Sequence, residues 1–332
     1  MKYESLRFNV EDGVAVITLS RPEKLNALDE QVARELLECL RRCEEDESVR
    51  VVVITGEGRA FSAGGDVKGM FKSIEEGQPG EFMDRLTEPL YKVSLKIREM
   101  SKLVIAAVNG PAMGAAFNLA IACDIVVASD NAKFAQSFVR LGLIPGMGGT
   151  YLLTRLIGPL KAGELFYTGR TVDAQEAFQL GIVNRVVPHE KLMEEVMKLA
   201  KLLAMGPALA LARTKKLLEQ ATRATDIRQH LEEERKIDDL CERFHRDIHP
   251  GNRLFLREYS RILHLEELPR YARITLRQAA CTAVLQLLKE VTGVLEKLRE
   301  EVQKYQNTLN AWEEEFKWYF AEKKDLLLQS EW

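Results

Sequence analysis

The sequence has little of what builds metal sites, membrane spans or nucleic-acid surfaces. Its five cysteines match no metal-ligand spacing, and no run of about 18 apolar residues predicts a transmembrane helix. A formal net charge of −3 over 332 residues gives no reason to expect a nucleic-acid partner. The N-terminal segment MKYESLRFNV lacks the apolar core of a signal peptide. We therefore expect a cytoplasmic protein in a reducing compartment, with no metal and no membrane span.

Histidine is also scarce, and all five histidines lie at residue 189 or later. Hydrophobic residues make up 46% of the chain, which is enough for a substantial core. Apolar runs around Glu11-Asp12-Gly13 predict a hairpin, and Asp29 is the expected N-cap of the next helix. Glycine and proline between residues 69 and 80 predict a mobile loop. Further strands are expected at 51–55, 104–108, 124–128 and 182–187, and further helices at 82–97, 148–157, 161–167, 173–180, 190–205, 207–221 and 226–244.

One stretch, VNGPAMGAAFNLAIACD at residues 108–124, passes from an apolar segment through a turn of small residues into an apolar helix. Without bulky side chains, the backbone of such a turn approaches a ligand closely. Free N–H groups at the helix N-terminus favour negative charge, and they suit an oxygen on which charge develops during a reaction. Close packing of a helix on a strand also uses small residues, and the stretch taken alone favours packing.

A second turn of the same kind, RAFSAGGDVKGM at residues 59–70, follows the expected strand at 51–55. Two such turns supply one N–H each to a single oxygen if they meet. The pair FSAGGD and NGPAMGAAFNLAIACD resembles the enoyl-CoA hydratase/isomerase family, also called the crotonase superfamily. The other matching pieces are RPEKLNAL at 21–28, GLIPGMGGT at 142–150 and YTGRTVDAQEAFQLGIVNRVV from Tyr167. The resemblance covers about residues 1–245.

The resemblance implies an α/β fold, a crotonase-like ββα spiral whose strands form two nearly perpendicular sheets. It also implies a homo-oligomer, either a trimer or a hexamer made of two trimers. We expect an acyl-CoA domain at 1–250 and a helical extension at 251–332. Within the extension, apolar residues from Cys281 to Tyr319 alternate steps of three and four, which predicts a heptad seam. A coiled coil and a single amphipathic helix lying on its own domain both fit that seam.

The resemblance also implies where the site lies. The backbone N–H groups of Gly65 and Ala115 are expected to donate to the thioester oxygen of an acyl-CoA substrate. No permanently bound cofactor is implied, because the coenzyme A thioester is itself the substrate. The residues expected to contact coenzyme A are Lys24, Leu25, Ala63, Asp66 and Val67.

The positions at which relatives carry catalytic carboxylates hold Asn118, Phe138 and Gly146 in this chain. An asparagine orients water or substrate, but it is no base near pH 7. Ordinary hydration by two glutamates is therefore not expected. The other polar side chains that are candidates for a role at the pocket are Asp84, Glu88, Gln136, Ser137 and Tyr151.

For Asp84 and Glu88 a solvated helix face is the favoured interpretation, and no spacing among these polar residues identifies a nucleophile with its base. The sequence thus leaves two functions open. The first is an acyl-CoA enzyme of the hydratase or isomerase kind that stabilises a thioester enolate. The second is a catalytically inactive protein that binds coenzyme A thioesters and assembles partners through the extension.

Overall fold

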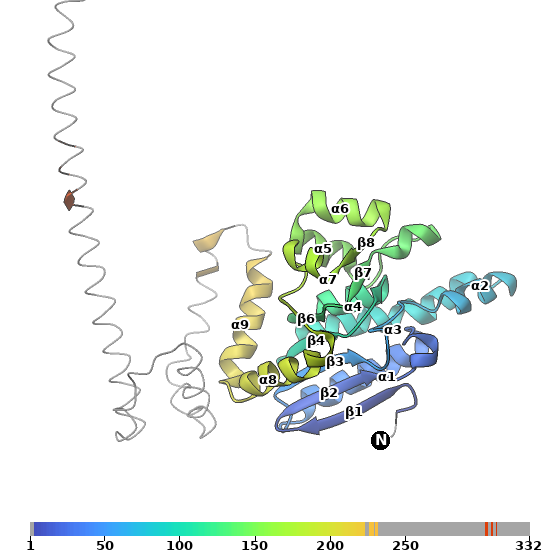
Figure 1. The fold of residues 1–332 in the computed structure, drawn as a ribbon, viewed down its shortest axis with the longest axis horizontal. Coiled ribbons are helices and arrows are strands. Elements are labelled where there is room, and N and C mark those ends of the chain that lie inside the picture. The colour runs from blue at the N-terminus through green and yellow to red at the C-terminus, as the bar shows by residue number, and fades with distance from the viewer. Residues whose placement is uncertain are drawn as a thin grey trace, which may run out of the picture. The chain divides into compact units, whose positions relative to one another are not determined.

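The fold is that of a computed structural model, which describes residues 3–222 together with residues 226–228, 230, 231, 303, 304, 307 and 310. Contacts divide the chain into two units, Met1–Tyr259 and Ser260–Trp332, and every element described below lies in the first (Figure 1). The predicted seam and most of the predicted helix at 226–244 lie outside the described residues. The predicted division of the chain after residue 250 stays a prediction.

A six-stranded sheet forms the centre of the first unit, and its strand order is β1-β2-β3-β4-β6-β9. The strands are β1 (Leu6–Glu11), β2 (Val14–Leu19), β3 (Val51–Gly56), β4 (Leu103–Val108), β6 (Ile125–Ser129) and β9 (Arg185–Val187). β1 pairs antiparallel with β2, and every other neighbouring pair is parallel. The predicted hairpin is confirmed, because Asp12 and Gly13 both take positive φ in its two-residue turn.

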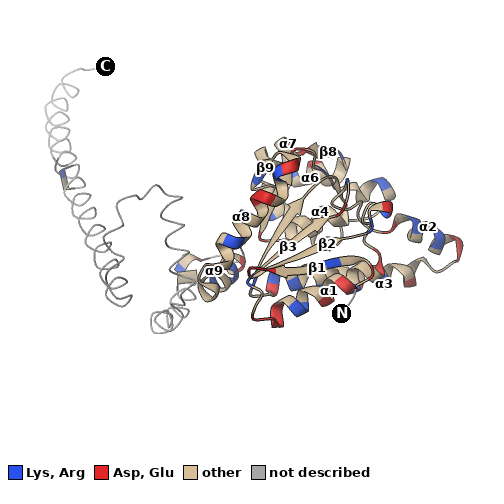
Figure 2. Cartoon of the chain, turned by 60° about the horizontal axis from the view of Figure 1, so that its bottom comes forward, with Lys and Arg blue, Asp and Glu red and all other residues tan. Residues whose placement is uncertain are grey.

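Both faces of this sheet are buried, which explains why β4 is apolar throughout and why Thr55 is the one polar side chain of β3. Alternate residues of β3 point to opposite sides, so Val52 and Ile54 join one hydrophobic cluster while Val51 and Val53 join another. The first cluster contains side chains of α1 (Glu30–Glu45), α3 (Pro79–Glu99) and α4 (Ala115–Ala122). The second contains side chains of α8 (Leu192–Ala204). In Figure 2, β2 and β3 are accordingly free of charged residues, whereas α1 carries many.

A smaller sheet has the order β5-β7-β8 and consists of β5 (Ala112–Met113), β7 (Lys133–Ala135) and β8 (Thr171–Asp173). The remaining helices are η1 (Pro22–Lys24), α2 (Val67–Glu75), η2 (Ser137–Leu141), α5 (Gly149–Ile157), α6 (Pro159–Thr168), α7 (Ala174–Gln179), η3 (His189–Lys191) and α9 (Ala208–Ala221). The predicted N-cap of α1 is confirmed, because the Asp29 carboxylate accepts the Val32 N–H at 3.0 Å.

The predicted mobile loop at 69–80 is wrong over most of its length, because α2 runs through Gly69 and α3 begins at Pro79. Asp66 caps α2 by accepting the Gly69 N–H at 3.0 Å. Gly69 also packs against Phe82 so closely that a Cβ there would lie 2.6 Å from the ring. Glycine in this helix therefore serves close packing, and tertiary contacts outweigh its low helix propensity.

A buried ion pair attaches α9 to the central sheet. The Lys215 ammonium is 2.8 Å from the Asp124 carboxylate, and it also donates to the carbonyls of Ile97 and Lys102 at 2.6 and 3.0 Å. Asp124 in turn accepts the Val104 N–H at 2.8 Å, which connects the pair to β4. Within the described part of the chain, no helix is long and apolar enough to cross a membrane.

Candidate active site

The two turns of small residues lie side by side. Ser62 donates to the Pro111 carbonyl at 3.1 Å, and its own carbonyl accepts the Met113 N–H at 3.1 Å. Gly64, at φ +93°, follows in a conformation that favours glycine. A Cβ on Gly64 would lie 2.4 Å from the Met113 oxygen and 3.6 Å from the Ala115 nitrogen. The missing side chain at Gly64 is therefore what allows the two turns to touch.

The segment after η1 supports the first of these turns from the other side. Leu25, which has a left-handed φ of 51°, accepts the Ala63 N–H at 2.8 Å. Leu28 donates to the Gly64 carbonyl at 2.7 Å. The motif RPEKLNAL thus holds the Ala63–Gly65 backbone in place through main-chain bonds, which do not depend on the identity of the side chains.

Gly65 and Ala115 line one pocket. Ala115 is the first residue of α4, where backbone N–H groups have no partner inside the helix. Among the described residues, neither the Gly65 nor the Ala115 N–H donates to a protein acceptor. The structure thus places both residues of the predicted pair at one cavity, with both donors free for an external oxygen.

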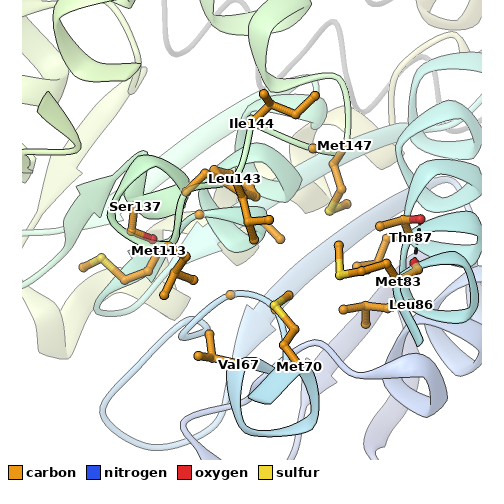
Figure 3. Close-up of a pocket in the computed structure, with 18 of the residues that line it drawn as sticks. Val67, Met70, Met83, Leu86, Thr87, Met113, Ser137, Leu143, Ile144 and Met147 are labelled. Carbon is orange, nitrogen blue, oxygen red and sulfur yellow. Dashed lines mark hydrogen bonds between the residues drawn. The ribbon is translucent and has the colours of Figure 1, made fainter. Parts of the chain in front are cut away.

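The pocket has a volume of about 150 Å³. Its walls come from the two turns, from α2, α3 and η2, and from the chain between η2 and α5. In Figure 3, Met70, Met83 and Met147 of these segments point toward a common space. The residues that line it are Ala63, Gly64, Gly65, Val67, Met70, Met83, Leu86, Thr87, Leu90, Tyr91, Met113, Gly114, Ala115, Ser137, Phe138, Leu141, Leu143, Ile144, Gly146 and Met147.

No Asp, Glu, His, Lys or Arg is among the described residues that line this pocket. Its polar side chains are the three hydroxyls of Thr87, Tyr91 and Ser137. Thr87 already donates to the Met83 carbonyl at 2.8 Å, within α3. The side chains of the described wall are therefore almost entirely apolar.

Two of the three positions at which the resemblance led us to expect carboxylates, Phe138 and Gly146, lie in the wall of the pocket. The Phe138 ring packs 3.6 Å from the place of a Cβ on Gly114, and 3.9 Å from that of a Cβ on Gly146. The Tyr91 ring also lies 3.6 Å from the place of a Cβ on Gly146. Two aromatic rings, those of Phe138 and Tyr91, thus lie beside Gly146.

Asn118, at the third position, does not line the pocket and is fully buried. Its amide donates to the Gly146 carbonyl at 2.8 Å and accepts from Gln136 at 2.7 Å. A Cβ on Gly149 would lie 2.2 Å from the same amide nitrogen. Asn118 therefore connects α4 to the chain before α5, and its predicted role toward water or substrate stays a prediction.

The residues expected to contact coenzyme A lie in the first turn and at the end of η1. Ala63 and Val67 line the pocket, and Lys24 is exposed at the end of η1. Asp66 uses its carboxylate as the cap of α2. All five expected residues, including Leu25, belong to two segments joined by the bond between Ala63 and Leu25.

The other polar candidates do not line the pocket, apart from Ser137. Asp84 and Glu88 are exposed on α3. Lys92 bonds Glu88 at 2.7 Å and lowers the pKa of that carboxyl. Tyr151 packs under Arg155, whose guanidinium carbon lies 3.5 Å from the ring centroid. The favoured interpretation of Asp84 and Glu88 as a solvated face is therefore confirmed.

Sequence reasoning missed most of the apolar wall, including Met113, Leu143 and Met147. The spacing of α3 contained part of the signal, because Met83, Leu86 and Leu90 recur at helical intervals. Among the described residues, no group of three His, Cys, Asp or Glu side chains is placed to hold a metal ion.

A model of the family described as enoyl-CoA hydratase/isomerase matches residues 9–256. The chain belongs to the enoyl-CoA hydratase/isomerase family. Crotonyl-CoA hydratase of Syntrophomonas wolfei is 37% identical over 242 residues, which cover 73% of this chain and 91% of that protein. The 1,2-epoxyphenylacetyl-CoA isomerase of Escherichia coli is 37% identical over 234 residues, covering 69% of this chain and 87% of the isomerase.

Solved structures agree with this membership. An enoyl-CoA hydratase from Polaromonas sp. JS666 is 36% identical, covers 74% of this chain and 93% of its own, and superposes with a TM-score of 0.67. The predicted crotonase-like fold is thus confirmed. Because both a hydratase and an isomerase are relatives, membership of the enoyl-CoA hydratase/isomerase family supports an enzyme of the lyase or isomerase kind.

Proposed function

We propose that this protein is an acyl-CoA enzyme that stabilises a thioester enolate with the backbone N–H groups of Gly65 and Ala115. The observation that carries the proposal is that Gly65 and Ala115 line one pocket while neither N–H has an acceptor among the described residues. A thioester oxygen placed between them gains negative charge as the enolate forms. Donors already in position are then worth more than mobile water, because they need no reorganisation.

The coenzyme A moiety lies in this proposal along the segments that carry Lys24, Leu25, Ala63, Asp66 and Val67. Lys24 is exposed and meets a phosphate as a point charge. Backbone groups near Ala63 and Val67 lead from the surface into the pocket. The enzyme works without a permanently bound cofactor, because the thioester brings the carbonyl on which the chemistry depends.

Proton transfer is the unusual part of the proposed mechanism. Proton carriers commonly contribute about 10²–10⁴-fold to such reactions, yet the described pocket wall contains no carboxylate. Asn118 acts indirectly here, since its amide holds the Gly146 carbonyl instead of facing the cavity. We therefore expect slow water addition, with the hydroxyls of Tyr91 and Ser137 as the protic side chains in the wall.

A second candidate function is binding without turnover. The same absence of carboxylates among the described lining residues favours it. Such a protein holds a coenzyme A thioester at the two N–H groups and assembles as a homo-oligomer, a trimer or hexamer, with the C-terminal extension contributing contacts.

One experiment distinguishes three cases: an active enzyme, a binding protein without turnover, and a protein with neither function. The carbonyl stretch of a ¹³C-labelled acyl-CoA thioester is measured by infrared difference spectroscopy, free and bound, and a panel of enoyl-CoAs is assayed with mass spectrometry of the products. Two hydrogen bonds to the carbonyl oxygen lower its stretching frequency. The enzyme predicts both the shift and product formation, whereas the binding protein predicts the shift alone. A bound thioester with an unshifted carbonyl would contradict the assigned role of the two N–H groups.

A further inference from the structure

The pocket wall beyond the two N–H groups is chemically uniform. Four methionines from four segments are among the lining residues: Met70 of α2, Met83 of α3, Met113 of β5 and Met147 of the chain before α5. In Figure 3 the labelled Met70, Met83 and Met147 point toward the same space as their aliphatic neighbours. Methionine is flexible and polarisable, so a wall rich in it adapts to ligands of different shape.

Charge selection follows from the composition of the wall. An ionised group is expensive to bury unless an opposite charge or several hydrogen bonds accompany it. No charged side chain is among the described lining residues, and the nearby carboxylates of Asp84 and Glu88 are on the solvent face of α3. A substrate with a charge at the far end of its acyl group would therefore lose the hydration of that charge without a partner.

Size follows from the volume. The cavity of about 150 Å³ is comparable to an apolar protein cavity of about 150 Å³ that binds benzene. A group of about six carbon atoms thus fills it. Leu141, Ile144 and Tyr91 are exposed residues of the same wall, so the pocket has an apolar rim on the solvent side.

From composition and volume together, we infer that the substrate of this site carries an uncharged, apolar acyl group whose buried part is about six carbons in size, aliphatic or aromatic. The inference rests on the proposed function, because the acyl group is placed by the thioester at Gly65 and Ala115. It goes beyond that function by excluding acyl groups that end in a carboxylate. Met83 is the specificity-determining residue easiest to test, since it lies in the wall beside the exposed Asp84.

The test uses calorimetry on the full-length protein with saturated acyl-CoAs, which bind without reacting. Affinity is expected to rise about fourfold for each methylene from acetyl-CoA to hexanoyl-CoA, which corresponds to about 0.8 kcal/mol. Phenylacetyl-CoA is expected to bind as tightly as hexanoyl-CoA. Glutaryl-CoA has the chain of pentanoyl-CoA with a carboxylate in place of the terminal methyl, and it is expected to bind at least about 100-fold more weakly than pentanoyl-CoA.

A variant then tests whether Met83 lies in the wall that contacts the acyl group. Met83→Arg is expected to reduce the ratio of the affinities for pentanoyl-CoA and glutaryl-CoA at least about tenfold, because it supplies the missing counter-charge. Asp84→Arg is the matched control, since it places the same guanidinium one residue away on the solvent face. It should leave the ratio of the two affinities as in the wild type. Circular dichroism checks both folds, and the wild-type panel decides the inference if Met83→Arg does not fold.

Several results would overturn the inference. Glutaryl-CoA that binds as tightly as pentanoyl-CoA would do so, and so would an affinity that does not rise from acetyl-CoA to hexanoyl-CoA. An unchanged ratio of the two affinities in folded Met83→Arg would remove Met83 from the acyl wall. These results leave the proposed function intact, because acyl-CoA still binds. A protein that binds no acyl-CoA, acetyl-CoA included, would instead end both.

Discussion

Replacing Ala115 by proline tests the proposed oxyanion donors most directly, because it replaces one N–H by a ring carbon and leaves the other backbone groups in place. Ala115 is the first residue of α4, a position at which proline is well accepted. The first helical hydrogen bond, from the Asn118 N–H to the Gly114 carbonyl at 3.1 Å, does not involve the nitrogen that proline changes. Gly114 precedes it at φ 50°, and as glycine it tolerates the restrictions that a following proline imposes.

The expected loss follows from the value of one donor. Removing a single oxyanion donor costs about 10²–10³-fold in kcat, or about 2.7–4 kcal/mol. Ala115 is only 6% exposed, so water does not readily replace the lost donor. We therefore expect Ala115→Pro to lower kcat at least about 100-fold on whichever enoyl-CoA the wild type converts, and to reverse part of the infrared shift of the bound thioester.

The control is Ala115→Gly, which keeps the N–H and removes only a methyl group. It should retain most of the wild-type kcat, and it separates loss of the donor from loss of packing. Circular dichroism and thermal melting establish that both variants fold. If folded Ala115→Pro turned over substrate at the wild-type rate with an unchanged carbonyl frequency, the assignment of this N–H would be refuted.

Three further predictions concern the pocket, the buried ion pair and the thiols. Hydration of crotonyl-CoA by the wild type should be slow, and Phe138→Glu should raise its rate by up to about 10²-fold because it places a carboxylate in the wall. Phe138→Gln, whose side chain is as large as glutamate but is no base, should not raise the rate. Fast hydration by the wild type would contradict the argument. Lys215→Met leaves the buried Asp124 unpaired and should cost about 3–5 kcal/mol of unfolding free energy, or about 6–20 °C in Tm. Lys216→Met, at the exposed neighbour, should change Tm little, and equal Tm values for the two variants would rule out a stabilising role of the pair. Burial raises the pKa of Cys39 from 9.0 to about 11 and that of Cys43 from 9.0 to about 12, so the folded protein should resist alkylation of both at pH 8, as peptide mapping would show. The unfolded chain ionises these thiols at their ordinary pKa, while the folded chain keeps them protonated. Their contribution to the free energy of unfolding should therefore be complete below pH 9 and decrease as the pH rises toward 11. Rapid alkylation of native Cys39 would contradict this.

The sequence by itself determined the local features that the site needs. The glycines and alanines of the two turns predicted close backbone approach, and the structure places Gly65 and Ala115 at one pocket as expected. The hairpin at Asp12-Gly13 and the cap at Asp29 were equally predictable. Such features depend on a few neighbouring residues, since backbone conformation and capping are local properties.

Local pattern also misled in one region, and it was silent in another. Glycine at position 69 predicted a loop, yet contact with Phe82 keeps that residue in a helix. The helix α4 is buried on every side, so periodicity did not reveal whether Asn118 faces the cavity or the chain before α5. A pattern shows which residues share a face, but it does not show what that face meets.

Only the tertiary structure decided which side chains form the acyl pocket and which residues attach α9. Met83 and Met147 meet in one wall although they are far apart in the sequence. Lys215 forms an ion pair with Asp124, which is 91 residues away in the sequence. The absence of charge from the described pocket wall is likewise a property of the assembled site, because charged residues such as Asp84 stand next to lining residues in the sequence but point to solvent. The selection of an uncharged acyl group that we infer depends on burial, and burial is set by the packing of distant segments.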